Sequence, residues 1–149
     1  MSLTLQVPAE YGYVFGAATA IFFVNTYHSI LTGKYRRKAN IPYPTCYAST
    51  ELADKDPAAF QFNCAQRAHS NFIENLTPLL GEMFVSGLHF PLLSAGLGLA
   101  WAVSRVLYAQ GYTSKGPNGR YVGAVHSLFD LVLKITSGYT AYTFIRGGL

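Results

Sequence analysis

The stretch YGYVFGAATAIFFVNTYHSILTG, from Tyr11 to Gly33, decides the fold class of this chain. It runs for 23 residues without an Asp, Glu, Lys or Arg, and about 20 apolar residues are enough for a helix to cross the hydrocarbon core of a bilayer. The stretch is apolar on all sides, so a helix formed by it has no solvated face. It predicts a membrane-spanning helix and argues against the alternative of a soluble helical bundle.

The composition of the whole chain favours the same fold class. Only 12% of the 149 residues are charged and the mean hydropathy is +0.20, whereas soluble domains have about 25% charged residues. The net charge of +4 does not indicate nucleic-acid binding, because the basic residues stand in short clusters between apolar runs. The first ten residues contain no Lys or Arg, so no cleavable signal peptide is expected. Cys46 and Cys64 are expected to be free thiols near the cytoplasmic face.

Further apolar runs follow the first. The block from Cys64 to Tyr112 is too long for one crossing and is interrupted at His89-Phe90-Pro91, where Pro91 predicts a tight hairpin. The last run extends from Tyr121 to Ile145. We predict one all-α membrane domain over residues 1–149, a four-transmembrane-helix bundle with spans 11–33, 65–88, 92–113 and 121–145 and polar loops 34–64 and 114–120.

The charges of the loops predict the orientation in the membrane. Four crossings place both termini on one side and the first and third loops on the other. The hairpin between the second and third spans carries no formal charge, whereas the first and third loops carry Lys34, Arg36, Arg37, Lys38, Lys55, Lys115 and Arg120. Basic loops remain in the cytoplasm, so we expect the first and third loops to face the cytosol.

Ionisable side chains inside the expected spans indicate a functional site, because each costs free energy in lipid unless it is paired or hydrated. At 100° per residue, one face of the second span collects a polar stripe of Asn63, Arg67, Asn71, Glu74 and Pro78. That face is expected to meet polar groups.

The third and fourth spans carry polar residues of their own. Trp101, Arg105, Tyr108 and Tyr112 share a stripe on the third span. Arg105 either joins the polar site or balances Glu74 or Glu82 inside the bundle. On the fourth span, Asp130 and Lys134 stand at positions i and i+4 and predict an ion pair.

The residue types in these stripes suit a small zwitterionic peptide. Guanidinium groups make forked hydrogen bonds to carboxylates, and a carboxylate binds an ammonium group. The Asn side chain can both donate to a peptide carbonyl and accept from a peptide N–H. Apolar grooves beside such a site would admit a lipophilic second substrate from the bilayer. The residues expected to line the cytoplasmic half of the bundle are Arg67, Asn71, Glu74, Tyr108, Tyr112 and Arg120.

Three segments resemble the membrane-associated proteins in eicosanoid and glutathione metabolism (MAPEG), specifically the microsomal glutathione S-transferase type 3 branch. The segments are FNCAQRAHSN from Phe62 to Asn71 with Glu74, SAGLGLAW from Ser94 to Trp101, and RVLYAQGY from Arg105 to Tyr112. Tyr43-Pro44 and the Glu10-Tyr11-Gly12 start also fit. The resemblance covers nearly the whole chain as a single MAPEG-like domain.

The resemblance implies a homotrimer of four-helix subunits in the endoplasmic reticulum membrane, with a glutathione site at each subunit interface facing the cytosol. It implies conjugation of glutathione to lipophilic electrophiles, or reduction of lipid hydroperoxides with glutathione. His69 would reach into the neighbouring subunit's site. The glutathione-binding positions carried over to this chain are Arg36, Arg67, His69, Asn71, Glu74, Tyr108 and Tyr112.

Two arginines are expected to act in the chemistry. The arginine that activates the thiol in leukotriene-forming relatives falls on Arg120, although one more residue separates it from Tyr112 than in that pattern. Arg37 matches a position proposed as a proton donor to epoxide substrates. A related tyrosine after the glutamate is replaced here by Asn75, which removes one contact of the leukotriene synthases.

Two other classes of function compete with an enzyme. One is a non-catalytic membrane scaffold of the same fold that binds lipid, and glutathione binding would separate it from the enzyme. The other is a small transporter or channel, which the lack of a broken helix or repeated half disfavours. His28, His89 and His126 are scattered without metal-ligand spacing, so no metal site is expected.

Overall fold

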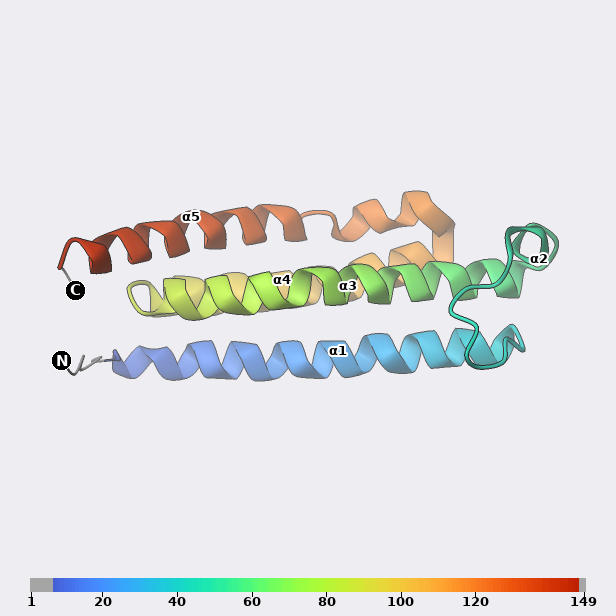
Figure 1. The fold of residues 1–149 in the computed structure, drawn as a ribbon, viewed down its shortest axis with the longest axis horizontal. Coiled ribbons are helices and arrows are strands. Elements are labelled where there is room, and N and C mark those ends of the chain that lie inside the picture. The colour runs from blue at the N-terminus through green and yellow to red at the C-terminus, as the bar shows by residue number, and fades with distance from the viewer. Residues whose placement is uncertain (1–6, 148–149) are drawn as a thin grey trace.

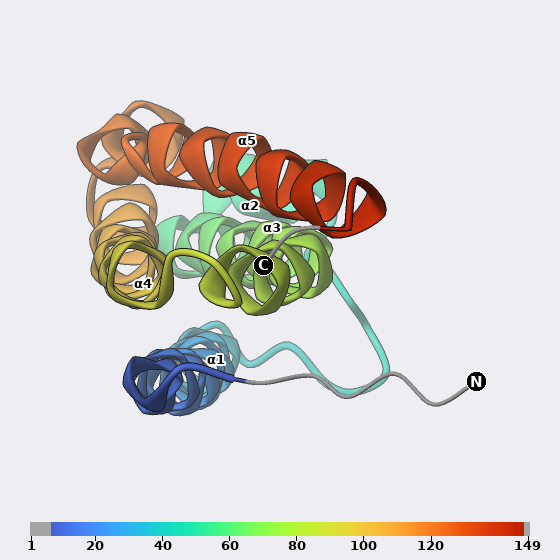
Figure 2. The same cartoon turned by 90° about the vertical axis from the view of Figure 1, so that its left-hand side faces the viewer.

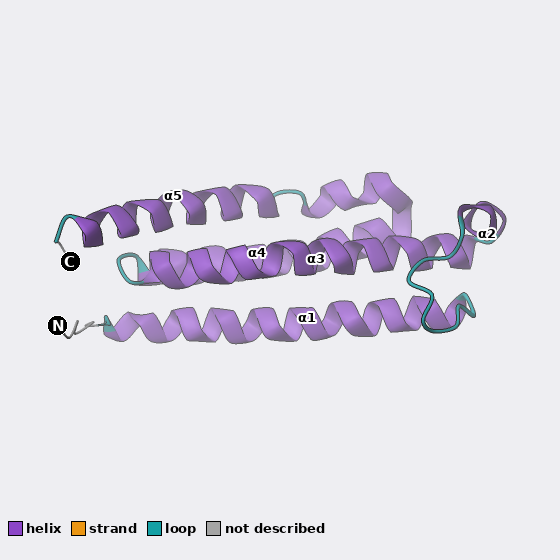
Figure 3. Cartoon of the chain, viewed as in Figure 1, coloured by secondary structure: helices purple, strands orange, loops and turns teal. Residues whose placement is uncertain are grey.

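The computed structural model describes residues 7–147, and helices account for most of them (Figures 1 and 3). The described residues contain no strand. A short 3-10 helix, η1 (Ala9–Tyr11), leads into the first long helix, and a longer one, η2 (Gly116–Gly123), precedes the last. The α-helices are α1 (Gly12–Lys38), α2 (Thr50–Lys55), α3 (Pro57–Gly87), α4 (Pro91–Lys115) and α5 (His126–Ile145).

The long helices run roughly parallel to one axis, and α3 and α4 lie side by side at the centre (Figures 1 and 2). α1 packs on α3 and α4 from one side, and α5 packs on them from the other. The start of α1 and the end of α5 lie at one end of the molecule, and α2 and the loop 39–49 lie at the opposite end (Figure 1). Polar side chains of α3 and α4 are therefore flanked by two apolar helices.

The hairpin between α3 and α4 forms where the sequence predicts it. The amides of His89 and Phe90 both donate to the carbonyl of Ser86. Pro91 occupies the first turn of α4, where a helix needs no N–H donor. The Ser94 hydroxyl donates to the Met83 carbonyl at 2.7 Å and ties the two helices together beside the turn.

Large apolar side chains lie both in the core and on the surface of the molecule. The core between the central helices and α1 contains fully buried Ile21, Phe72, Leu79, Met83 and Trp101. The outer faces of α1 and α5 expose Phe15, Phe22, Phe23, Ile30, Leu128, Leu131, Ile135 and Ile145. Extensive exposed apolar surface is typical of a protein that contacts lipid or another subunit.

Two helical stretches, Ala9–Lys38 and Pro91–Ile145, are long and apolar enough to cross a membrane. The second stretch includes α4, η2 and α5. α3 lies outside both, and its Arg67, Glu74 and Glu82 interrupt its apolar surface. The helical content and the apolar stretches thus agree with an all-α membrane protein.

Helices extend into the predicted polar loop 34–64 from both of its ends. α1 continues to Lys38, because basic residues stabilise the negative end of a helix dipole. α3 begins already at Pro57, and the Asp56 side chain caps it by accepting from the amide of Ala58 at 2.8 Å. The irregular segment between α1 and α2 therefore shrinks to residues 39–49.

The expected fourth span, 121–145, and the loop 114–120 also have different bounds. α4 continues to Lys115, and residues 121–125 do not belong to α5, which begins at His126. The chain folds back along α4 as η2. There Gly119 packs directly against the backbone of Gly111, and Gly123 packs directly against the backbone of Ser104. The missing side chains of these glycines allow the close backbone approach.

A polar contact joins α3 to α5 on the side away from α1. Lys134 pairs with Asp130, as the i, i+4 spacing predicts, and its ammonium also lies 3.4 Å from a carboxylate oxygen of Glu82. One turn further along α3, the Ser86 hydroxyl donates to Thr136 at 2.7 Å. These side chains hold α5, which buries only Leu133 and Thr140 fully.

Candidate functional site

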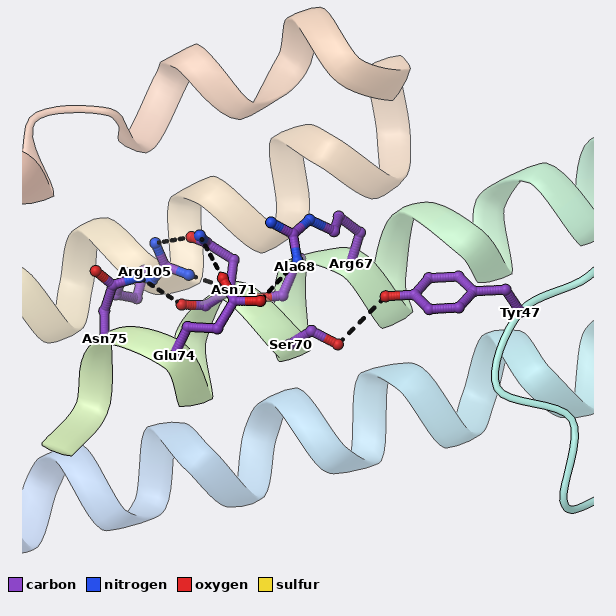
Figure 4. Close-up of polar contacts among 8 residues, drawn as sticks. All are labelled: Tyr47, Arg67, Ala68, Ser70, Asn71, Glu74, Asn75 and Arg105. Carbon is purple, nitrogen blue, oxygen red and sulfur yellow. Dashed lines mark hydrogen bonds and ion pairs between the residues drawn. The ribbon is translucent and has the colours of Figure 1, made fainter.

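The polar stripe of α3 forms a row of bonded side chains (Figure 4). Nη1 of Arg67 lies 2.8 Å from Oε1 of Glu74, and Nδ2 of Asn71 lies 3.4 Å from Oε2 of the same carboxylate. Residues spaced three, four or seven apart share one helix face, so regular helix geometry alone brings them together. The two charged side chains are 48% and 53% exposed in the single chain, which leaves the row open to a ligand.

Pro78 follows this row one turn later in α3. Proline lacks an amide hydrogen, so Pro78 cannot donate to the carbonyl of Glu74 one turn earlier in α3. The carbonyl of Glu74 therefore lacks the hydrogen bond that the amide at position 78 would make in a regular α-helix.

Arg105 of α4 lies behind the row and is completely buried, with 0% of its surface exposed. Its Nη1 donates to Oδ1 of Asn71 at 2.9 Å, and its Nη2 donates to the carbonyl of Ala68 at 3.4 Å (Figure 4). The guanidinium carbon also lies 4.5 Å from the centre of the Tyr108 ring, a cation–π distance.

Within residues 7–147, Arg105 forms no salt bridge; Glu74 pairs with Arg67, and Glu82 pairs with Lys134. Glu74 still lies near enough to Arg105 for their charges to interact, so the alternative in which Arg105 balances a glutamate inside the bundle stays open. The Arg105 guanidinium itself is surrounded by neutral acceptors and aromatic rings.

Tyr108 and Tyr112 of α4 join the same region. Their rings are 5.8 Å apart in an edge-to-face arrangement, and both are buried in a cluster with Cys64 and Ala68 of α3. Their spacing of one helical turn places both phenol rings on the same face of α4, and this face lies beside the α3 row.

Arg120 is carried by η2 rather than by one of the long helices. Its Nη2 donates to the Tyr121 hydroxyl at 3.3 Å, and its guanidinium carbon lies 5.2 Å from the centre of that ring. The Tyr121 hydroxyl raises the pKa of Arg120 above its usual value, and the hydroxyls of Tyr108 and Tyr112 act more weakly in the same direction. Arg120 therefore remains a cation on the tyrosine side of the site.

Arg36 and Arg37 lie elsewhere, at the end of α1. Arg36 is buried, its Nη1 donates to the carbonyl of Thr45 at 2.7 Å, and its guanidinium stacks 4.3 Å from the centre of the Tyr43 ring. It holds the loop 39–49 in place and does not touch the α3 row in the single chain. Arg37 is exposed and lines a surface pocket with Asn40.

His69 lies on a different face of α3 from the polar row. Its ring is stacked 5.9 Å from the ring of His28, a buried residue of α1. The structure of one chain therefore separates His69 from Arg67, Asn71 and Glu74, in line with its opposite position on the helical wheel.

Sequence reasoning missed several residues of the site. Arg105 was visible as a member of the Trp101–Tyr112 stripe, but its contact with Asn71 was not. His126 has its Nε2 2.9 Å from Nη1 of Arg105, and only the fold of η2 brings it there. Asn75 donates to the carbonyl of Asn71 at 2.7 Å.

The side chains of this region have functional groups that can bind a charged organic molecule. Residues 7–147 contain no group of three His, Cys, Asp or Glu side chains close enough to hold a metal ion. They do contain a half-exposed guanidinium, a half-exposed carboxylate, an amide and two phenols within one region. Such a set can bind carboxylates and an ammonium group at once.

A comparison with protein families identifies the relatives of this chain. The model of the MAPEG family matches residues 14–138, which include most of α1, all of α2, α3 and α4, and most of α5. Proteins of this family are membrane-associated and use glutathione, and they include glutathione transferases, glutathione peroxidases and leukotriene synthases. The match covers far more than half of the chain, and the protein belongs to the MAPEG family.

Proposed function

We propose that this protein is a glutathione-dependent transferase and peroxidase of the microsomal glutathione S-transferase type 3 branch. Its second substrates are lipophilic electrophiles or lipid hydroperoxides that reach the site through the membrane. The observation that carries the proposal is the row of Arg67, Asn71 and Glu74 beside Tyr108 and Tyr112, in a family that uses glutathione.

The charged row matches the charges of glutathione. Arg67 offers forked donors to a carboxylate, and Glu74 offers an acceptor to the ammonium group. In the free chain these two residues pair with each other, but exposed ion pairs contribute only about 0–1 kcal/mol. Exchanging that pair for the charges of the tripeptide therefore costs little. Asn71 and the tyrosine hydroxyls are left for the peptide amides and the thiol.

The nucleophile in the proposal is the glutathione thiolate. A free thiol has a pKa near ~8.5, and lowering it by two units requires about 2.7 kcal/mol of preferential stabilisation of the anion. One guanidinium shielded from water supplies an effect of this size. Arg120 has this role in the proposal, because it is a cation on the side of Tyr108 and Tyr112. Its hydrogen bond to Tyr121 is exposed in the single chain, so the shielding in the proposal comes from a neighbouring subunit.

The bonds that change differ between the two substrate classes. With an aryl halide, the thiolate sulfur forms a bond to carbon and the halide leaves with the bonding electrons. With a hydroperoxide, the sulfur bonds to the outer oxygen, the O–O bond breaks, and the alkoxide takes a proton. A second glutathione then converts the resulting sulfenic acid to the disulfide and water. Arg37 is proposed as proton donor where the substrate is an epoxide.

The membrane arrangement in the proposal has four crossings, with α2 and the basic segments in the cytosol. Arg67 and Glu74 are half-exposed on a helix flanked by apolar surface, and charges at such a place need water or protein around them. We propose that a homotrimer in the endoplasmic reticulum membrane covers them, with His69 and Arg36 acting across the subunit boundary.

A second candidate is a lipid-binding scaffold without catalysis. An apolar groove between α1 and α4 favours it, since Gly12, Gly16 and Gly96 leave room there beside Leu92 and Leu99. An acyl chain fits a groove of this chemistry. A scaffold would keep lipid binding and have no glutathione turnover, so one measurement of turnover separates the two candidates.

The test is glutathione binding and turnover by the purified protein in lipid nanodiscs, with an aryl halide and with a fatty-acid hydroperoxide. Wild type is expected to bind glutathione and to show the absorbance of the bound thiolate. Arg120→Ala is expected to lose this absorbance and most of kcat. Arg146→Ala is the matched control, because it removes an exposed arginine after α5.

Two results would count against the proposal. If the wild-type protein bound no glutathione, the proposed enzymatic function would be wrong and the lipid-binding scaffold would be the remaining candidate. An Arg120→Ala protein with normal thiolate absorbance and rate would keep the enzyme and exclude Arg120 from thiol activation.

A further inference from the structure

His126 stands where three elements meet. It is the first residue of α5, directly after the turn that follows η2, and its ring faces α4. Its Nε2 lies 2.9 Å from Nη1 of Arg105, and its ring centre lies 5.6 Å from that of Tyr108. Neither the polar stripes nor the proposed chemistry assigns it a role.

The contact with Arg105 fixes the protonation pattern of the ring. A guanidinium nitrogen only donates hydrogen bonds, so Nε2 of His126 accepts and the ring hydrogen is on Nδ1. The Ser127 hydroxyl lies 3.4 Å from Nδ1 and can accept from it. His126 is therefore a neutral acceptor in one tautomer.

The same guanidinium nitrogen connects His126 to the α3 row. Nη1 of Arg105 lies 2.9 Å both from Nε2 of His126 and from Oδ1 of Asn71. With its oxygen held by Arg105, the Asn71 amide turns its nitrogen toward Glu74. A hydrogen-bonded chain thus runs from α5 through α4 to the exposed side of α3 (Figure 4 shows the part from Arg105 to Glu74).

Arg105 has few alternatives to His126. It is wholly buried, and its Nε has no hydrogen-bond partner among the described residues. Without the His126 acceptor, the buried Arg105 guanidinium would lose a further hydrogen-bond partner. Unsatisfied buried donors cost free energy, and a small rotation of the Arg105 side chain toward other acceptors relieves this cost. Such a rotation moves the Asn71 oxygen or breaks its bond.

We propose that His126 is a positioning residue for glutathione binding, which holds Arg105 and through it the orientation of the Asn71 amide. The inference rests on the proposed function, because the ligand at Asn71 is glutathione. His126 touches no reacting atom in this role. It should therefore affect the KM for glutathione rather than the KM for the lipophilic substrate.

The experiment compares substitutions at position 126 in nanodiscs. His126→Leu removes the acceptor and is expected to raise the glutathione KM about tenfold, the size expected for an unsatisfied buried donor, with the electrophile KM unchanged. His126→Gln places an amide oxygen near the position of Nε2 and should restore the glutathione KM. His126→Asn remains polar but is too short to reach Arg105, and should resemble His126→Leu. His89→Leu is the control, because His89 is exposed on the hairpin.

A double-mutant cycle shows whether the effect passes through Asn71. If it does, His126→Leu adds nothing to the KM in an Asn71→Ala background. Additive effects, or an unchanged glutathione KM in both His126→Leu and His126→Asn, would overturn the inference while leaving the proposed function intact. A wild type that binds no glutathione would overturn both.

Discussion

At the scale of single residues, Glu74 gives the most direct test of how the charged ends of the ligand are held. Glu74→Gln keeps the shape of the side chain and removes the charge that pairs with Arg67 at 2.8 Å. We expect the glutathione KM to rise about tenfold, the scale of a lost charge-assisted hydrogen bond. The kcat should change little, because the ammonium group is held equally in the ground state and the transition state.

Glu51→Gln is the matched control for this substitution. Glu51 also pairs with a basic residue at 2.7 Å on a helix, namely Lys55 of α2, and it is exposed. Its loss should leave all kinetic constants unchanged. A Glu74→Gln protein whose kcat falls while its KM stays constant would assign Glu74 to the chemical step instead of to binding.

The limits of sequence reasoning are clearest for long side chains. Helix periodicity placed Arg67, Asn71 and Glu74 on one face because the period of an α-helix is fixed. Helix periodicity could not predict to which of several nearby acceptors a guanidinium group donates its hydrogen bonds. Arg105 turned out to bond Asn71 and His126, and Arg36 turned out to hold the loop at Thr45. These choices depend on neighbours that only the tertiary fold supplies.

At the scale of elements, the position of Arg120 depends on how η2 packs against α4. A Cβ atom at Gly119 would overlap the carbonyl oxygen of Gly111, and overpacking of this kind typically costs about 1–3 kcal/mol. Gly119→Ala should therefore lower the thermal unfolding midpoint and shift Arg120, the next residue. We expect weaker thiolate absorbance and a lower kcat/KM than in wild type.

Gly138→Ala controls for the addition of a methyl group to a glycine. Gly138 lies within α5, and a Cβ atom there would meet nothing within 4 Å. Alanine is favoured over glycine inside a helix by about 1 kcal/mol, so this variant should be at least as stable as wild type. If the Gly119→Ala protein had the same unfolding midpoint and the same kcat/KM as the Gly138→Ala protein, the close contact between η2 and α4 would not hold Arg120 in position.

The ends of the elements explain which parts of the fold were predictable. Pro91 marks the α3–α4 turn because it removes a donor and restricts the preceding residue, and the turn forms there. The start of α3 at Pro57 was missed, because the polar residues around Asp56 resemble a loop in composition although Asp56 is a helix cap. Residues 121–125 were missed because two glycine contacts, invisible in a hydropathy pattern, hold them on α4.

At the scale of the whole molecule, the long helices match the thickness of a membrane. α1 has 27 residues, about 40 Å at 1.5 Å per residue, which exceeds the roughly 30 Å hydrocarbon core. The start of α1, the end of α5 and the α3–α4 hairpin lie at one end, and the loop 39–49 lies at the other (Figure 1). In a four-pass arrangement these two ends must be on opposite sides of the bilayer, which cysteine labelling can measure.

The two cysteines suit such an experiment, because Cys46 is exposed in the loop 39–49 and Cys64 is buried. In sealed microsomes with the cytosolic face outward, a membrane-impermeant maleimide should label Cys46 in a Cys64→Ala protein. His89→Cys, made in a protein without both native cysteines, should be labelled only after permeabilisation, since the uncharged hairpin is expected on the lumenal side. Labelling of both positions in intact vesicles would exclude the four-pass arrangement. The reverse pattern would keep four crossings but place the Arg67–Glu74 row in the half of the membrane away from cytosolic glutathione.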